Sequence, residues 1–422
     1  MKYLPIYILI LALLPNTELS AQETTLSLEE IYSRAKENYP LSKQRDLIRL
    51  SSDYTIENLR KGWWPQANLQ GQASHQSDVT SLPIHLPGVD LPSVNKAQYR
   101  LVGEISQTIY DGGITRKQIQ LSESSAIIAT QQLEAELYQL RERINQLFFG
   151  ILLTNQQLAQ TDILRKDILS GIEKIYAAIE NGTAIKSNED VLKAELLKLD
   201  QRVIELKFTK KAFLDMLGLY LNQQLDENIA LETPPPVLPV TTIARPELKL
   251  FDYQRKKLDL QHQIIDSRNK PKLSLFLQTG FGNPSPVNML SNKISGFYIA
   301  GIRLNWSFSG FYTAKNEKTV LDISRRTIDV QQEQFLFNTT LSMQQQQSGI
   351  NKWAQMIETD KNIIALRQSI KNTAAIQLEN GLIHSSDYLR EVNAEDQARQ
   401  NMIIHQIQML LTQYQYKTTT GN

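Results

Sequence analysis

The segment 180–192 reads ENGTAIKSNEDVL, and the segment 379–391 reads ENGLIHSSDYLRE. Both begin with Glu-Asn-Gly, continue through a serine and reach an Asp-x-Leu triplet, and about 200 residues separate them. Each copy lies in the middle of a long stretch without proline. Because self-similarity along a chain is typical of repeated architecture, the two copies predict two equivalent structural units.

The proline-free stretches predict very long helices. No proline occurs between Pro92 and Pro234, or after Pro286. A proline in a helix interior costs about 3 kcal/mol, so its absence permits unbroken helices. Apolar residues recur every three or four positions through 133–151 and 192–206, which is typical of coiled-coil hairpins. At 1.5 Å per residue, the segment 114–181 predicts a helix about 100 Å long.

Four segments predict strands because apolar and polar residues alternate along them: Gln66–Gln76, Tyr99–Tyr110, Lys272–Gly282 and Phe297–Ser309. Two-faced strands of about ten residues are typical of outer-membrane barrels, although a half-buried soluble sheet alternates in the same way. The aromatic residues at the strand ends and the export signal described next favour the membrane. About eight strands are needed to close the smallest barrel, so four predict closure by several copies. A trimer would supply twelve strands, but the strand count does not fix the number three.

The N-terminus predicts a cleaved signal peptide at 1–21. Lys2 precedes the apolar run 4–14, and Ala21 offers a small residue for cleavage. The run is shorter than the roughly 20 residues of a spanning helix. A formal net charge of +1 gives no reason to expect nucleic acid. The absence of cysteine excludes disulfides, thiolate metal sites and cysteine nucleophiles. No catalytic set, cofactor motif or metal-ligand spacing stands out, so the chain is not expected to be an enzyme.

The order of these segments predicts the domain organisation. Residues 22–232 form a first repeat made of a helix, two strands and a helical hairpin. A proline-rich linker follows at 233–246, and residues 247–422 form the second repeat.

Two kinds of junction recur beside the duplicated segment. The strand-to-helix junction 107–113 reads QTIYDGG, with a weaker counterpart LNWSFSG at 304–310. The helix-to-strand junction 63–65 reads WWP and is matched by NKP at 269–271. By the order, spacing and duplication of these segments the chain resembles the outer-membrane efflux protein family, the TolC-like outer-membrane factors, over essentially its whole mature length.

The resemblance implies a mostly α-helical protein with transmembrane β-strands. Three copies would form a twelve-stranded barrel in the outer membrane and a helical tunnel in the periplasm. The tunnel tips would dock on a periplasmic adaptor that couples to an inner-membrane transporter. The chain would then be a passive, gated duct for efflux or type I secretion.

The junction residues are expected to have structural roles. Asp111 followed by Gly112 and Gly113 suits a turn that ends a strand and caps a helix, since a carboxylate accepts from free backbone N–H groups. Pro65 and Pro271 suit a change from helix to extended chain.

The tips carry the expected functional residues. Gly182 and Gly381 suit left-handed helix ends, which by itself explains them. The resemblance further implies adaptor contact for these two glycines and for Ser187 and Ser385.

The resemblance also implies a periplasmic gate. Asp387 lies six residues past the second tip glycine, where relatives often carry an acid at the constriction. Rings of carboxylates would attract cations there. Arg390 stands where some relatives carry a second acid, and it could instead pair with Asp387. The first copy has two extra residues before its Asp-x-Leu triplet, so the two tip loops are expected to differ in length.

Two other functions remain open from the residues. A periplasmic coiled-coil adaptor would have one helical hairpin flanked by sheet-rich domains. A secreted structural coiled coil would form a rod without strands.

Overall fold

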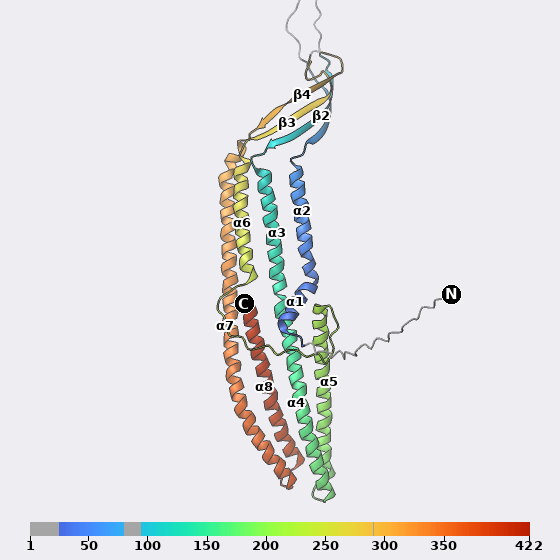
Figure 1. The fold of residues 1–422 in the computed structure, drawn as a ribbon, viewed down its shortest axis with the longest axis vertical. Coiled ribbons are helices and arrows are strands. Elements are labelled where there is room, and N and C mark those ends of the chain that lie inside the picture. The colour runs from blue at the N-terminus through green and yellow to red at the C-terminus, as the bar shows by residue number, and fades with distance from the viewer. Residues whose placement is uncertain (1–24, 80–93, 290) are drawn as a thin grey trace, which may run out of the picture. The chain divides into compact units, whose positions relative to one another are not determined.

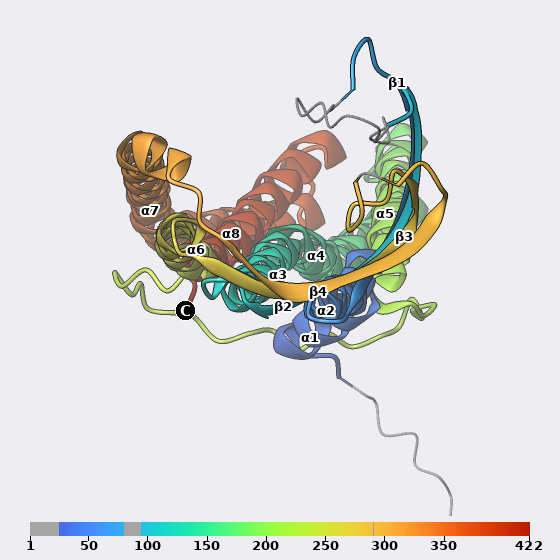
Figure 2. The same cartoon turned by 90° about the horizontal axis from the view of Figure 1, so that it is seen from above.

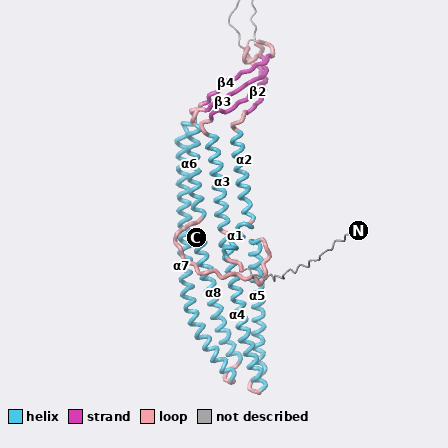
Figure 3. The backbone as a smooth tube through the Cα atoms, viewed as in Figure 1, coloured by secondary structure: helices cyan, strands magenta, loops and turns pink. Residues whose placement is uncertain are grey.

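The computed structural model describes residues 25–79, 94–289 and 291–422, so the predicted signal peptide lies outside the described residues. The helices are α1 (Leu28–Asn38), η1 (Pro40–Lys43), α2 (Gln44–Lys61), α3 (Ile114–Tyr138), α4 (Leu140–Glu180), α5 (Lys186–Leu221), α6 (Pro246–Arg268), α7 (Ser309–Glu379) and α8 (Ser385–Thr420). The strands are β1 (Gln66–His75), β2 (Ala97–Tyr110), β3 (Lys272–Asn283) and β4 (Ser295–Asn305). The predicted fold class, long helical hairpins with a four-stranded sheet, is confirmed (Figure 3).

The chain divides into two compact units that cut across the sequence repeat. The first unit contains 1–38, 140–239 and 346–415, and the second contains 39–139, 240–345 and 416–422. The predicted helix 114–181 is interrupted at Gln139, on the boundary of the units. The backbone of Gln139 stays helical (φ −65°, ψ −18°), and its N–H donates to the carbonyl of Glu136 at 3.2 Å. The interruption is thus a tightened turn, which the apolar spacing does not reveal.

The first unit is entirely helical apart from its turns and connecting segments (Figure 1). Helix α1 packs on the α4–α5 hairpin, where Ile31, Phe148 and Leu217 have no exposed surface. Near the hairpin tips a second cluster joins α4 and α5 to the facing segments of α7 and α8, through Ile168, Leu192 and Val392 among others. The period of three and four residues therefore places one apolar stripe of each helix against its neighbours.

The second unit contains the sheet, whose strands follow the order β1-β2-β3-β4 and are all antiparallel. Seen from above, the strands follow one curved surface (Figure 2). Their register separates the residues into two faces. One face has rows such as Ala67, Ile105, Leu277 and Ala300, and the other has rows such as Asn68, Glu104, Gln278 and Ile299.

Burial shows which face of the curved sheet is concave. In β2 and β3 most side chains of the apolar face are exposed, whereas those of the polar face are largely half-buried. Leu69 and Tyr298 on the apolar face are 75% and 76% exposed. A curved sheet crowds side chains on its concave side and spreads them on its convex side. The polar face is therefore concave and the apolar face convex.

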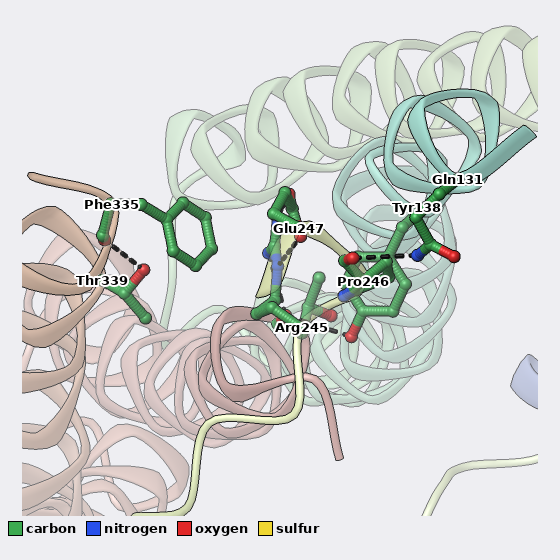
Figure 4. A network of polar contacts seen from close by, with 8 residues as sticks. Gln131, Tyr138, Arg245, Pro246, Glu247, Phe335 and Thr339 are labelled. Atoms are coloured by element: carbon green, nitrogen blue, oxygen red, sulfur yellow. Dashed lines mark hydrogen bonds and ion pairs between the residues drawn. The ribbon is translucent and has the colours of Figure 1, made fainter. Parts of the chain in front are cut away.

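The second unit also contains the end of the proline-rich linker, residues 240–246, and the C-terminus. Helix α6 begins at Pro246, and the Arg245 guanidinium pairs with Glu247 and donates to the carbonyl of Thr418 at 3.2 Å (Figure 4). The same guanidinium lies 4.8 Å from the ring of Tyr138, whose hydroxyl also donates to Thr418. These contacts tie the start of α6 to α3 and to the last turn of α8. In the first unit, one isolated bridge joins Leu26 and Leu231.

Among the described residues, none of the helices combines the length and apolar character needed to cross a membrane.

Candidate functional site

The two hairpin tips have the same turn. Gly182 and Gly381 adopt φ values of +71° and +67°. In each tip the glycine N–H donates to the carbonyl three residues back at 3.0 Å, and the next N–H donates to the carbonyl five residues back at 2.8 Å. This is the Schellman motif, which satisfies the last carbonyls of α4 and α7. A Cβ at either glycine would meet nothing within 4 Å, so only the backbone angle requires glycine there.

The expectation that the tip loops differ in length is wrong. Helices α5 and α8 begin at Lys186 and Ser385, each four residues after its glycine. The two Asp-x-Leu triplets therefore lie inside helices, two positions out of register. The counterpart of Asp387 is Asn188, and the N–H of each donates to the carbonyl three residues back at 3.0 Å. The two loops therefore have the same length. At this position the second tip has a carboxylate, Asp387, where the first tip has an amide, Asn188.

The predicted serines occupy unlike positions. Ser187 is exposed, whereas Ser385 is fully buried and its hydroxyl has no partner among the described residues. Ser385 is the first residue of α8 and faces the packed side of the hairpin. The exposed counterpart of Ser187 is Ser386, one residue further on. A partner that contacts the tip surface would therefore meet Ser386 and not Ser385.

A hollow of about 360 Å³ lies between the two tips. Both tip glycines line it, and its wall combines apolar side chains with amide and charged ones. The lining residues are Ile175, Ala178, Gly182, Thr183, Ala184, Ile185, Asn188, Leu378, Glu379, Asn380, Gly381, Ile383 and His384. The duplicated segments thus meet at one place in the first unit.

The predicted gate residues form a loose ion pair. Asp387 Oδ1 lies 3.7 Å from Arg390 Nη1, and the Arg390 Nε donates to Glu391 Oε1 at 3.1 Å. Because the side chains of Asp387 and Arg390 are 41% and 71% exposed, the pair adds little stability. Asp387 Oδ2 also accepts from the N–H of His384 at 3.4 Å, which helps to cap α8. The carboxylate therefore has a structural role and remains open to solvent.

Close packing behind the tips fixes the two hairpins together. A Cβ at Gly171 of α4 would lie 3.0 Å from the ring of Tyr388 in α8, so the absence of a side chain makes room for this ring. Burial, with a smaller effect of Asp167, raises the pKa of Tyr388 to about 12. The phenol therefore stays neutral and acts as a packing group.

Polar contacts also join the hairpins. Lys371 of α7 lies 2.8 Å from Asp167 of α4 and 3.5 Å from the buried Glu395 of α8. A further salt bridge joins Lys174 Nζ of α4 and Glu379 Oε2 of α7 at 3.0 Å.

Asp396 of α8 is a buried carboxylate that side chains of two other helices contact. It accepts from Gln160 of α4 at 3.0 Å and lies 3.3 Å from the Arg202 guanidinium of α5. Burial raises the pKa of Asp396, and the contacts with Gln160 and Arg202 only partly oppose this effect. Sequence reasoning missed Asp396, Lys371 and Gly171, because charged residues and glycine in a coiled-coil pattern look the same whether they are exposed or packed.

The predicted junction residues lie in the second unit. Asp111 accepts from the N–H groups of Gly113 at 2.7 Å and Thr115 at 2.8 Å, and so caps α3. Gly112 has φ +76°, and a Cβ there would lie 2.7 Å from the carbonyl oxygen of Ser267. Gly113 has φ +85° with open space around it. The backbone angles therefore require both glycines, and close approach to α6 requires the first in addition.

The prolines occupy the opposite junctions. Pro65 lies between the end of α2 at Lys61 and the start of β1, and Pro271 lies between the end of α6 and the start of β3. The Trp306 indole donates to the carbonyl of Asn269 at 3.0 Å, which joins the helix-to-strand and strand-to-helix junctions of the second half.

Comparison with known proteins gives matches at the level of structure. No protein-family model matches the sequence, and no curated protein sequence matches it. The chain is similar to solved structures of CusC (TM-score 0.66, 12% identity, 93% of this chain and 91% of that chain), the outer membrane protein VceC from Vibrio cholerae (0.64, 11%, 94% and 96%) and the Neisseria gonorrhoeae MtrE outer membrane channel in its open state (0.64, 12%, 94% and 89%). The chain therefore has the fold of these outer-membrane channels, and the resemblance seen in the sequence is confirmed for the fold.

Proposed function

We propose that this chain is a TolC-like outer-membrane factor: the outer-membrane channel of a tripartite efflux or type I secretion system. It is a passive duct with no enzymatic activity. Residues 1–21 are its cleaved signal peptide, residues 22–232 and 247–422 are its two structural repeats, and 233–246 is the linker.

The sheet carries this proposal. Its convex face exposes leucine, isoleucine and aromatic side chains, and among the described strand residues it has no Asp, Glu, Lys or Arg. Burying such a surface in lipid is favourable at roughly 25 cal/mol per Å² of apolar area. The concave face is polar and suits a water-filled interior. Membrane insertion with water inside thus accounts for both faces.

The free strand edges support a homo-oligomer. The outer edges of β1 and β4 have no strand partner among the described residues. Open edges cannot face lipid because their backbone groups would stay unsatisfied. Since β1 and β4 are antiparallel, β4 of one copy can pair with β1 of the next and continue the antiparallel order. Three copies would give twelve strands.

The tips support adaptor docking. Gly182 and Gly381 line the hollow between the tips, and Ser187 and Ser386 are exposed near it. A periplasmic adaptor would contact this exposed surface, with an inner-membrane transporter behind it. Asp387 and Arg390 lie beside this surface and are proposed to form the gate. MtrE has been solved in an open state, which supports a gated duct here.

Three measurements test the function. Expressed full-length chain is expected in the outer-membrane fraction, and the purified protein is expected to give stepwise conductance in planar bilayers. Recovery in the soluble periplasm without conductance would favour the coiled-coil adaptor. A circular dichroism spectrum in detergent without a strand signal would favour the structural coiled coil.

The absence of cysteine makes a docking test simple. In Ser386→Cys and Ser187→Cys variants the single thiol is expected to react with maleimide in the purified protein and to be protected in cells that express the adaptor and transporter. Ser385→Cys is the matched buried control and should react slowly in both. Equal reaction of Ser386→Cys with and without the partners would contradict docking at the tips.

A further inference from the structure

The concave face of the sheet carries an excess of positive charge. Its charged side chains are Arg100, Glu104, Lys272 and Arg303, placed there by the register of β2, β3 and β4. Strand β1 adds none, because its concave residues are glutamine, asparagine and serine. Each copy therefore presents three cations and one carboxylate on this face.

One cation is neutralised and held in place. Arg303 Nη1 donates to Glu104 Oε1 at 2.8 Å, and Gln278 Nε2 donates to the other carboxylate oxygen at 2.6 Å. The Arg303 guanidinium also lies 4.5 Å from the ring of Phe276, which covers Gly301. The Arg303–Glu104 pair is held by these contacts and is close to neutral, so it adds little to the electric field of the concave face.

The other two cations are not neutralised. Arg100 and Lys272 are exposed, and neither has a hydrogen-bond acceptor or an acidic partner among the described residues. Arg100 is paired with Gly282 near the loop end of the sheet, ten residues along β3 from Lys272 at the helix end. At about 3.4 Å per residue they lie roughly 34 Å apart along the strand. One uncompensated cation thus stands at each end of the concave face.

We propose that Arg100 and Lys272 make the strand-built part of the duct selective for anionic solutes. The proposal rests on the channel function, because the concave face lines a pore only if copies close a barrel. Symmetry then turns each cation into a ring, and rings of arginine or lysine favour anions in a pore. The field of an exposed charge extends about 10 Å at 0.1 M salt, far enough to act on solutes passing along the wall.

Reversal potentials across bilayers in a KCl gradient test the proposal. Arg100→Gln and Lys272→Gln are each expected to lower the chloride-to-potassium permeability ratio by about twofold near 0.1 M salt, where the charges are least screened. Glu104→Gln releases Arg303 from its partner and is expected to raise the ratio. Gln72→Ala, in the same strand row as Arg100, is the uncharged control and should leave the ratio unchanged. The tip carboxylates are the same in all four variants, so differences report the strands.

The outcomes separate this inference from the proposed function. Conductance steps in all variants with unshifted reversal potentials would overturn the anion selectivity and leave the channel intact. A shift of Glu104→Gln in the same direction as Arg100→Gln would overturn it as well. No conductance from any variant or from the wild type would instead refute the channel.

Discussion

At the scale of single residues, the two tips differ in one functional group. Asp387 and Asn188 occupy the same place in turns with matching hydrogen bonds. The cap that Asp387 Oδ2 gives to the His384 N–H needs an oxygen acceptor but no negative charge, and the backbone of the first tip forms with an amide. The charge is the part left to explain by function.

Replacing this charge tests the gate. Asp387→Asn makes the second tip resemble the first, so the fold should be kept while the potassium-to-chloride permeability ratio falls. Arg390→Gln, which removes the nearby cation, is expected to raise that ratio. Single-channel recordings in ion gradients measure both. Unchanged selectivity in Asp387→Asn would remove Asp387 from the gate.

The buried Asp396 predicts a dependence of stability on pH. Because burial raises its folded-state pKa, the folded chain holds a proton on Asp396 at pH values where the unfolded chain has lost it. Stability from this group is therefore highest below the unfolded pKa and is lost as pH rises through the folded pKa. Asp396→Asn, whose side-chain oxygen can still accept from Gln160, is expected to raise the melting temperature at pH 7 but not at pH 3.5. Asp387→Asn at the exposed tip is the matched control. Equal effects of Asp396→Asn at both pH values would contradict the prediction.

At the scale of helices, the hairpins fit together through small local matches. Gly171 leaves the room that Tyr388 fills, and Lys371 bridges carboxylates on two other helices. These contacts join α4, α7 and α8 behind the tips. A change in the relative position of the hairpins at the tips has to break or rearrange them.

Overfilling this contact should loosen the hairpins. Gly171→Val places side-chain atoms where the Tyr388 ring lies, and overpacking costs about 1–3 kcal/mol. Ser170→Val is the matched control, since residue 170 is exposed on the same helix. Thermal unfolding followed by circular dichroism should show a lower melting temperature only for Gly171→Val. Equal shifts for both variants would show that helix propensity, and not packing, sets the effect.

The elements themselves were largely predictable from the sequence. Proline-free stretches and apolar spacing placed the long helices, and alternation placed all four strands, because each pattern directly reports an apolar and a polar side of the element. The tightened turn at Gln139 was missed, since its backbone angles stay helical. The equal length of the tip loops was also missed. The Asp-x-Leu triplets have the same sequence pattern but lie at different positions within α5 and α8, so aligning them suggested a longer first loop. Burial of Ser385 and Asp396 depends on neighbours from other helices, which local patterns do not contain.

At the scale of the whole molecule, each strand has to be apolar on the convex face of the sheet and polar on the concave face. Leu69 and Gln70 are adjacent in β1 but belong to the convex and the concave face. Leu69→Arg would place a charge against lipid, at a cost of about 2–4 kcal/mol at the membrane midplane. Gln70→Arg would place the same charge in water and should be tolerated.

Membrane fractionation and non-denaturing electrophoresis measure this difference. Leu69→Arg is expected to reduce the amount of the proposed oligomer in the outer-membrane fraction, while Gln70→Arg should match the wild type. Loss of the oligomer in both variants would argue against water on the concave side.

The unpaired outer edges of β1 and β4 also bear on how the protein reaches its final state. In the proposed channel, a single exported copy carries two open strand edges and a wide apolar surface, which together favour misassociation. Correct pairing in the proposed homo-oligomer needs other copies, so its rate rises with the local concentration of the chain, and the apparent stability of the assembled protein depends on that concentration too. When expression is reduced, the rate of assembly should therefore fall more steeply than the amount of the chain. Periplasmic chaperones that shield strand edges should be needed most at low expression.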